Sequence, residues 1–233
     1  MLRKLFPAIA CLLTALFLFL FAGCGDDKTT SAGDPAPTVT DIDGNEYEIV
    51  TIGTQEWMAE NLKVTHYRNG DEIPNVTENA AWKVLTSGAW SSPHNDAMLI
   101  GTYGRLHNFH AFNDAGVLAP YGFHVPSHAE WQTLMDYLGG ISVAGGKLKE
   151  TGLDHWAAPN GGATNETGFS GLPAGHRNWD GGYFSFLIQA YFWSSTQDND
   201  TDAWYWCLYY DHASAARDNY LKLDGFSIRC VKD

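Results

Sequence analysis

The most regular hydrophobic pattern in the chain predicts a helix between Pro126 and Gly139. Apolar residues recur there with the spacing of one buried helical face. These residues are Trp131, Leu134, Met135 and Leu138. Ser127 precedes them as a predicted N-cap, and Glu130 three residues later completes a capping box. The polar groups at this helix start therefore have a structural task, and we expect no catalytic role for them.

An alternating pattern predicts a β-hairpin over residues 39–53. The run Asp43-Gly44-Asn45 lies between the two alternating stretches and tolerates the positive φ angles of a tight turn. The surrounding letters, DIDGNE, resemble the start of a calcium loop, but the carboxylate that such a loop needs at its twelfth position is missing. We therefore interpret this run as a turn.

Aromatic and β-branched residues predict strands toward the C-terminus, at residues 190–197, 202–210 and 225–233. In the second segment the two alternating faces are both aromatic, with Trp204 and Trp206 on one and Tyr205 on the other. We therefore expect a strand that is covered on both sides. The remaining predictions are a short helix near residues 79–88, an ambiguous segment at 103–112 and glycine-rich ordered loops at 160–184.

The N-terminal residues have the layout of a secretory signal peptide. Arg3 and Lys4 precede an apolar run of residues 5–21, and small residues lead to Cys24. The ending FAGC resembles a bacterial lipobox, in which the cysteine becomes the lipidated N-terminus after cleavage. We therefore expect a lipoprotein signal peptide at residues 1–23, with an ordinary cleaved signal or an uncleaved anchor as the alternative.

Composition after the signal peptide fits an exported domain on a tether. Residues 24–38 are small, polar and acidic, as in a flexible tether to a folded domain at residues 39–233. The net charge of −13 repels phosphate backbones, so we expect no nucleic-acid partner. In an oxidising compartment Cys207 and Cys230 are expected to form a disulfide; two buried free thiols are the alternative.

Segments in chain order resemble the Fibrobacter succinogenes major paralogous domain over residues 39–233. They are DIDGNEYEIVTIGTQEWMAENLKV, YGRLHNFHAF, GFHVPSHAEWQTL, GFSGLPAGHR, YFWSST, DAWYW and GFSIRCVKD. This family contains secreted and surface lipoproteins of bacteria. The resemblance implies a location at the outer membrane or cell surface, with lipid on Cys24, including palmitate, joining the chain to the membrane.

The family in turn resembles the fold that C-type lectins share with formylglycine-generating enzymes, whose LPTEAEWE block is similar to VPSHAEWQ here. That resemblance implies an α+β domain with small twisted antiparallel sheets, one or two helices and long ordered loops. The enzymes need a close pair of reactive cysteines, which Cys207 and Cys230 do not match in spacing. The run GFSGL also misses the nucleophile elbow of serine hydrolases. We expect no enzyme and no catalytic residue; an enzyme with an unrecognised site is the less favoured alternative.

Two sequence features are candidate metal sites. Asp198, Asp200 and Asp202 carry oxygens that suit calcium, although such a run is more often a solvated turn. His107 and His110 have a spacing that suits two metal ligands, and we prefer the interpretation that they fill aromatic positions. The motifs by which C-type lectins bind calcium and sugar together are incomplete, so calcium is the only cofactor that we consider.

Aromatic richness favours a binding function. The chain has 9 tryptophans and 11 tyrosines, and exposed aromatic rings stack on sugars or anchor protein partners. Residues 209–220 are predicted to form a loop with the composition of adaptable binding loops. The candidate ligand-binding residues are Tyr209, Tyr210, Asp211, His212, Ser214, Asn219, Tyr220 and Trp179. We expect a surface module that binds an extracellular glycan or protein. The alternative is a variable receptor of the kind that diversity-generating retroelements mutate.

Overall fold

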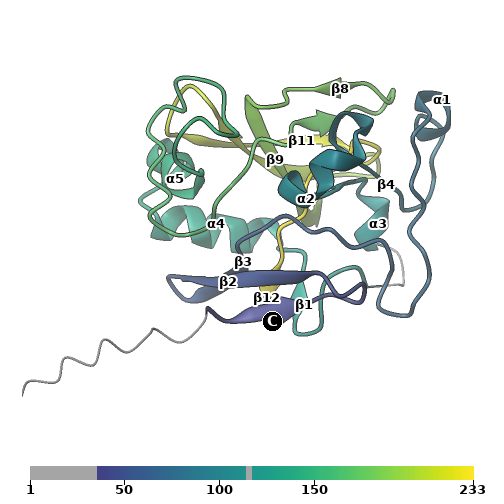
Figure 1. Cartoon of the computed structure of the whole chain (residues 1–233), viewed down its shortest axis with the longest axis horizontal. Coiled ribbons are helices and arrows are strands. Elements are labelled where there is room, and N and C mark those ends of the chain that lie inside the picture. The colour runs from purple at the N-terminus through teal and green to yellow at the C-terminus, as the bar shows by residue number, and fades with distance from the viewer. Residues whose placement is uncertain (1–35, 114–116) are drawn as a thin grey trace, which may run out of the picture. The chain divides into compact units, whose positions relative to one another are not determined.

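Antiparallel sheets form the framework of the domain (Figure 1). The structure is a computed structural model that describes residues 36–113 and 117–233. The larger sheet has the order β1-β2-β3-β12-β6 and the smaller one β11-β10-β9. The strands of the larger sheet are β1 Thr38–Thr40, β2 Glu46–Ile52, β3 Gln55–Met58, β6 Phe123–His124 and β12 Val231–Lys232. Those of the smaller sheet are β9 Gln189–Gln197, β10 Asp202–Tyr209 and β11 Ala215–Leu221.

Two strand pairs and short helices complete the domain. The pairs are β4 Trp90–Ser91 with β5 Leu106–His107, and β7 His176–Arg177 with β8 Tyr183–Phe184. The helices are α1 Asn79–Trp82, α2 Ile100–Tyr103, α3 His110–Asn113, α4 His128–Tyr137 and α5 Ile141–Leu148, with 3-10 turns at Pro93–Asn95 and Ala97–Leu99. This mixture of small antiparallel sheets and few helices confirms the α+β class. No helix among the described residues has the length and apolar character to cross a membrane.

The predicted signal peptide at residues 1–23, its lipidation site Cys24 and the tether up to residue 35 lie outside the described residues. The described chain forms one compact unit, Ala36–Asp233. Its first strand begins at Thr38, one residue before the predicted start of the domain.

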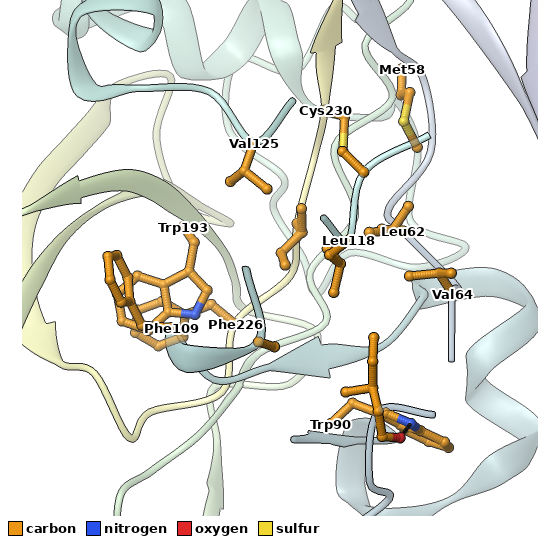
Figure 2. Packing of buried hydrophobic residues seen from close by; sticks show 14 of the residues in the cluster. Met58, Leu62, Val64, Trp90, Phe109, Leu118, Val125, Trp193, Phe226 and Cys230 are labelled. Carbon is orange, nitrogen blue, oxygen red and sulfur yellow. Dashed lines mark hydrogen bonds between the residues drawn. The ribbon is translucent and has the colours of Figure 1, made fainter. Parts of the chain in front are cut away.

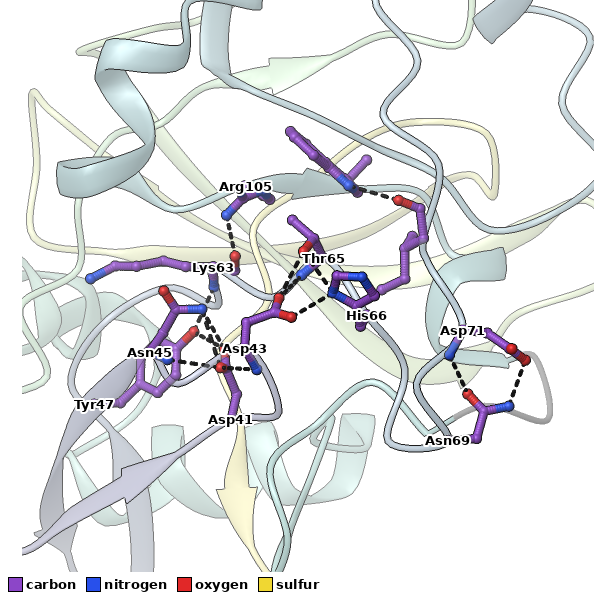
Figure 3. Close-up of polar contacts among 12 residues, drawn as sticks. Asp41, Asp43, Asn45, Tyr47, Lys63, Thr65, His66, Asn69, Asp71 and Arg105 are labelled. Carbon is purple, nitrogen blue, oxygen red and sulfur yellow. Dashed lines mark hydrogen bonds and ion pairs between the residues drawn. The ribbon is translucent and has the colours of Figure 1, made fainter.

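The predicted hairpin is confirmed as the pair β1 and β2, and its turn is organised by Asp41 (Figure 3). The Asp41 carboxylate accepts hydrogen bonds from the backbone N–H groups of Asp43 and Asn45, each at 3.0 Å, and from the Tyr47 hydroxyl at 2.6 Å. Asp43 itself accepts from the Thr65 hydroxyl at 2.8 Å and lies against the His66 ring. The acidic groups of DIDGNE are therefore used to hold a turn, as expected.

The predicted long helix is α4, and its capping box is present. The Glu130 N–H donates to the Ser127 hydroxyl at 3.3 Å, and the Ser127 N–H donates to the Glu130 carboxylate at 2.7 Å. The helix predicted near residues 79–88 is reduced to the single turn of α1. The ambiguous segment 103–112 contains both a strand, β5, and a helical turn, α3.

The segment 209–220 is not the loop that we predicted. Tyr209 ends β10, residues 210–214 make a turn, and β11 begins at Ala215. Among the described strands β11 pairs with β10 alone and forms an edge of the smaller sheet. Residues 217–220 are exposed and lack the hydrophobic alternation of a buried strand. The polar composition that indicated a loop belongs to a solvent-facing strand.

β10 is covered on both faces, as its aromatic pattern predicted. Trp206 and Leu208 pack with α4 and α5, whereas Tyr205 and Cys207 face a second hydrophobic cluster. Figure 2 shows part of that second cluster, in which Trp193 lies with Phe109 and Phe226.

The predicted disulfide between Cys207 and Cys230 is not formed. Both cysteines are free and buried, although they belong to the same hydrophobic cluster. Cys207 is held in β10 between Tyr191 of β9 and Ala216 of β11. Cys230 lies just before β12, near Met58 (Figure 2). Its carbonyl accepts a hydrogen bond from the Met58 N–H in β3 of the larger sheet. The alternative of two buried free thiols describes the structure. Burial raises the pKa of both thiols.

Candidate ligand-binding site

The turn of residues 210–214, which joins β10 to β11, is held by hydrogen bonds from a buried lysine. The Lys149 ammonium donates hydrogen bonds to the carbonyl oxygens of Gly161 at 2.9 Å, Tyr209 at 2.7 Å and His212 at 3.0 Å. Lys149 is fully buried and its Nζ lies 5.3 Å from the centre of the Trp156 ring. Burial lowers the pKa of Lys149 to about 8. One cation therefore ties together backbone segments that are far apart in the sequence.

Glycines bring the backbone of α5 and of the 160–164 loop into direct contact with this turn. A Cβ atom on Gly161 would lie 2.4 Å from the Asp211 carbonyl oxygen, and one on Gly145 would lie 2.5 Å from the Ser214 carbonyl oxygen. The Gly146 N–H donates to the Ala213 carbonyl at 2.7 Å. Side chains at these glycines would displace the turn, so its conformation is set by main-chain contacts.

Two side chains of the 210–214 turn reach solvent, whereas the Ala213 methyl group faces Gly162 of the 160–164 loop. Asp211 and His212 are exposed. The His212 ring lies 4.7 Å from the ring of Tyr209, and its Nδ1 is 2.7 Å from the Ser214 hydroxyl. The turn therefore presents the predicted polar and aromatic groups on a backbone that is already ordered.

A row of tyrosines extends from this turn across one face of the smaller sheet. The strand register places Tyr191 beside Cys207 and Tyr220 beside Ala203, on the face that also carries Tyr205 and Tyr209. Ring centres are 5.5 Å apart between Tyr191 and Tyr205, and 5.6 Å apart between Tyr205 and Tyr220. The strand pairing thus places two of the predicted residues, Tyr209 and Tyr220, on one face, with the buried rings of Tyr191 and Tyr205 between them.

A pocket of about 350 Å³ opens on this face, and we call it the tyrosine pocket. Its lining consists of His176, Asn178, Phe184, Ser185, Tyr191 and Tyr220. The volume lies at the lower end of the range for small-molecule sites, roughly 300–1,000 Å³. Tyr220 and Phe184 are 37% and 50% exposed, so their rings form the accessible rim.

His176 forms the inner wall of the tyrosine pocket. Its ring centre lies 4.6 Å from that of Tyr191, 5.7 Å from Phe184 and 5.9 Å from Tyr220. Its Nδ1 is buried and has no hydrogen-bond partner among the described residues. Burial lowers the pKa of His176 to about 4, so the imidazole is neutral at physiological pH.

Three of the predicted ligand-binding residues lie outside this surface, and one of them, Tyr210, packs against the hydrophobic cluster of α4 and α5. The Asn219 side chain points to the opposite face of β11 and donates to the Asp198 carboxylate at 3.0 Å. The centre of the Trp179 ring lies 5.0 Å from the Lys83 ammonium. The backbone N–H of Trp179 donates to the Asp224 carboxylate at 2.8 Å. Of the predicted ligand-binding residues, Tyr220 alone lines the tyrosine pocket as the structure describes it.

Sequence reasoning missed part of the pocket. Alternation in the segment 190–197 does not by itself show that Tyr191 shares a face with Tyr205, because that also requires the register of β9 against β10. His176 and Phe184 meet through the pairing of β7 with β8, and nothing in the local sequence predicts that pair.

The three aspartates of the predicted calcium site lie at the opposite end of the same sheet, in and beside the turn of residues 198–201. A lysine occupies the inside of this turn: the Lys222 ammonium donates to the side-chain carbonyl of Gln197 at 3.1 Å and to the backbone carbonyls of Asn199 at 2.8 Å and Asp200 at 2.9 Å. The Asn199 side chain caps the turn by accepting from the Thr201 and Asp202 N–H groups, both at 2.9 Å.

The aspartate carboxylates do not converge. Asp198 accepts from two asparagine side chains, Asn199 at 3.1 Å and Asn219 at 3.0 Å, and Asp202 accepts from the Thr201 hydroxyl at 2.8 Å. Within residues 36–113 and 117–233 no group of three or more His, Cys, Asp or Glu side chains is arranged to hold a metal ion. The structure describes this run as a turn around the Lys222 ammonium, and calcium at Asp198, Asp200 and Asp202 stays a prediction. His107 of the other candidate metal pair is fully buried in β5, and burial lowers its pKa to about 3.

The fold and the site together define an α+β domain that presents an aromatic pocket on one face of its smaller sheet. The chain belongs to the Fibrobacter succinogenes major domain family, whose model matches residues 50–232. No significant match was found among curated proteins or solved structures.

Proposed function

We propose that this protein is a non-catalytic surface module that binds an extracellular glycan or protein through its tyrosine pocket. The observation that carries the proposal is the tyrosine pocket, in which aromatic rings and the polar groups of Asn178 and Ser185 line one concavity. Ligand sites combine these features, an apolar or aromatic wall with a few placed polar groups.

The use of the polar groups elsewhere supports binding over catalysis. The Ser127 hydroxyl and the Glu130 carboxylate serve the cap of α4, and Glu130 also contacts the His124 ring at 2.8 Å. Burial makes both cysteine thiols harder to ionise. Neither group has the environment of an activated nucleophile. An enzyme with an unrecognised site remains the less favoured alternative.

The same proposal includes the outer membrane or cell surface as the location, a lipid on Cys24 as the anchor, and kinship with the C-type lectin fold. The FAGC run and the acidic residues after it support the anchor. Membership in the Fibrobacter succinogenes major domain family supports a surface role through the lipoproteins of that family.

The test uses the full chain on arrays of glycans and of extracellular proteins. We expect a bound ligand whose signal is lost in Tyr220→Ala and retained in Tyr121→Ala, because Tyr121 is 73% exposed and lies outside the pocket lining. Absence of any ligand on both arrays, or binding that ignores Tyr220, contradicts the proposal.

The fixed backbone of the 210–214 turn favours one second candidate, a variable receptor. Main-chain groups and Lys149 hold this turn, so the exposed side chains of Asp211 and His212 are free to change without altering its path. If the chain is such a receptor, its locus contains a template repeat and a reverse transcriptase gene. A locus without both contradicts this candidate and leaves the binding proposal intact.

A further inference from the structure

The tyrosine pocket combines aromatic faces with neutral hydrogen-bonding groups. Phe184 and Tyr220 supply accessible ring surface at the rim, and Tyr191 and His176 continue it inward. Asn178 and Ser185 add an amide and a hydroxyl to the same lining. Ring faces pack against the C–H groups of a ligand, while amides, hydroxyls and imidazole pair with its hydroxyl groups.

Charge around the pocket selects against anions. The described lining contains no lysine or arginine, and its histidine is neutral at physiological pH because burial lowers its pKa. Arg177, the neighbour of His176 in β7, is fully buried and donates to backbone oxygens of Gly181 and Thr77, away from the lining. A carboxylate or phosphate on a ligand would find no cation to balance it here.

Acidic groups stand beside the lining. The Asn178 side chain donates to the Asp180 carboxylate at 3.2 Å. Asp218 lies opposite Tyr205 in the strand register. Burial raises the pKa of the Tyr220 phenol, and the nearby Asp218 carboxylate raises it further. Asp224 also faces Tyr220, but burial raises its pKa to about 8 and keeps it largely protonated at neutral pH. The pocket therefore favours a ligand without negative charge.

Metal is not needed to complete this lining. The polar groups belong to side chains that the fold already positions, and the aspartates once considered for calcium are engaged at the 198–201 turn. From these observations we propose that the tyrosine pocket binds one uncharged pyranose ring, without calcium. This inference rests on the proposed binding function and names the ligand class of the same site.

The experiment measures binding of small saccharides to the full chain in a detergent that has no sugar headgroup. The probes are methyl glycosides of glucose, galactose, mannose and N-acetylglucosamine, the matching uronates, and choline as a cation for an aromatic pocket. Ligand-observed NMR reports binding, and each titration is repeated with a chelator. We expect at least one neutral glycoside to bind about tenfold more tightly than its uronate, a difference of about 1.4 kcal/mol, with no effect of the chelator.

Three variants locate the binding. Tyr220→Ala is expected to abolish the neutral glycoside signal, whereas Tyr220→Phe keeps the ring and most of the affinity. Tyr121→Ala is the matched control and leaves binding unchanged, because Tyr121 is exposed outside the pocket lining. Both substituted tyrosines are partly exposed, so these variants are expected to fold.

Several results overturn the inference. A uronate or choline that binds as tightly as every neutral glycoside, a chelator that removes binding, or a signal that survives in Tyr220→Ala each contradicts it. If no saccharide binds but a protein on the array is recognised through Tyr220, the pyranose inference fails while the proposed binding function stands. If neither class binds, both fail.

Discussion

Two turns at opposite ends of β10 are each held by a lysine ammonium, and the two lysines come from different parts of the fold. The 198–201 turn surrounds the Lys222 ammonium, which comes from the end of the adjacent strand β11. The 210–214 turn rests on Lys149, which follows α5 and also binds Gly161 of a separate loop. A cation supplied by the chain orders both turns. We call each lysine with its carbonyl acceptors a cage. The Lys222 cage needs only a neighbouring strand, whereas the Lys149 cage requires the tertiary fold.

The difference in burial makes the two cages unequal. Lys149 is fully buried, so its acceptors have no access to water if the ammonium is removed, whereas Lys222 retains 9% of its exposure in a turn made of exposed residues. Unsatisfied buried acceptors each cost about 1–3 kcal/mol, and acceptors that water can reach cost less. We therefore expect the stability of the domain to depend more on Lys149 than on Lys222.

The largest effect is expected from Lys149→Met. Methionine preserves much of the volume but leaves the carbonyls of Gly161, Tyr209 and His212 without this donor, which should lower the free energy of unfolding by about 3 kcal/mol. Chemical denaturation followed by tryptophan fluorescence measures the change.

Lys147→Met is the matched control for this prediction. Lys147 lies in the last turn of α5 and makes a partly exposed ion pair with Glu166 at 3.0 Å. Loss of such a pair should change stability by no more than about 0.5 kcal/mol. Equal effects of the two substitutions would refute the role assigned to Lys149.

The contrast between the turns also explains which features of the fold could be predicted from the sequence. The cap of α4, the β1–β2 turn and the two-sided burial of β10 follow from neighbouring residues and were predicted. The polar edge strand β11 carries no hydrophobic alternation, so its composition was interpreted as a loop.

Long-range contacts account for the errors at the candidate site. The aspartate run near residue 200 has the composition of a cation site, but its local sequence does not indicate that the Lys222 ammonium, about 20 residues further along the chain, lies inside the turn. The pocket wall of His176 depends on the pairing of β7 with β8, and the free cysteines depend on the separate sheets that hold them. Without these pairings, residue type alone cannot place such groups.

A smaller effect is expected from Lys222→Met. The turn keeps its Asn199 cap, and water can reach the oxygens that Lys222 releases, so we expect a loss of about 1 kcal/mol. In parallel, millimolar calcium should leave the unfolding midpoint of the unsubstituted protein unchanged, because its aspartates do not converge. A loss as large as that for Lys149→Met would remove the contrast between the turns, and a calcium-dependent midpoint would restore the metal site.

The smallest effect is a pH dependence that belongs to the Lys149 cage. Burial holds the pKa of this lysine at about 8 in the folded protein, below the 10.5 of an unfolded lysine, so between these values the unfolded state binds more protons and stability rises with pH. From pH 8 to 9 the gain should be about 1 kcal/mol. Buried tyrosines such as Tyr205 act in the opposite direction, since burial raises their pKa, and the quantity to measure is therefore the difference between the unsubstituted protein and Lys149→Met at each pH. That difference should grow across this window for Lys149→Met and stay flat for Lys147→Met. A flat difference for both would mean that Lys149 keeps its ordinary proton affinity in the folded protein.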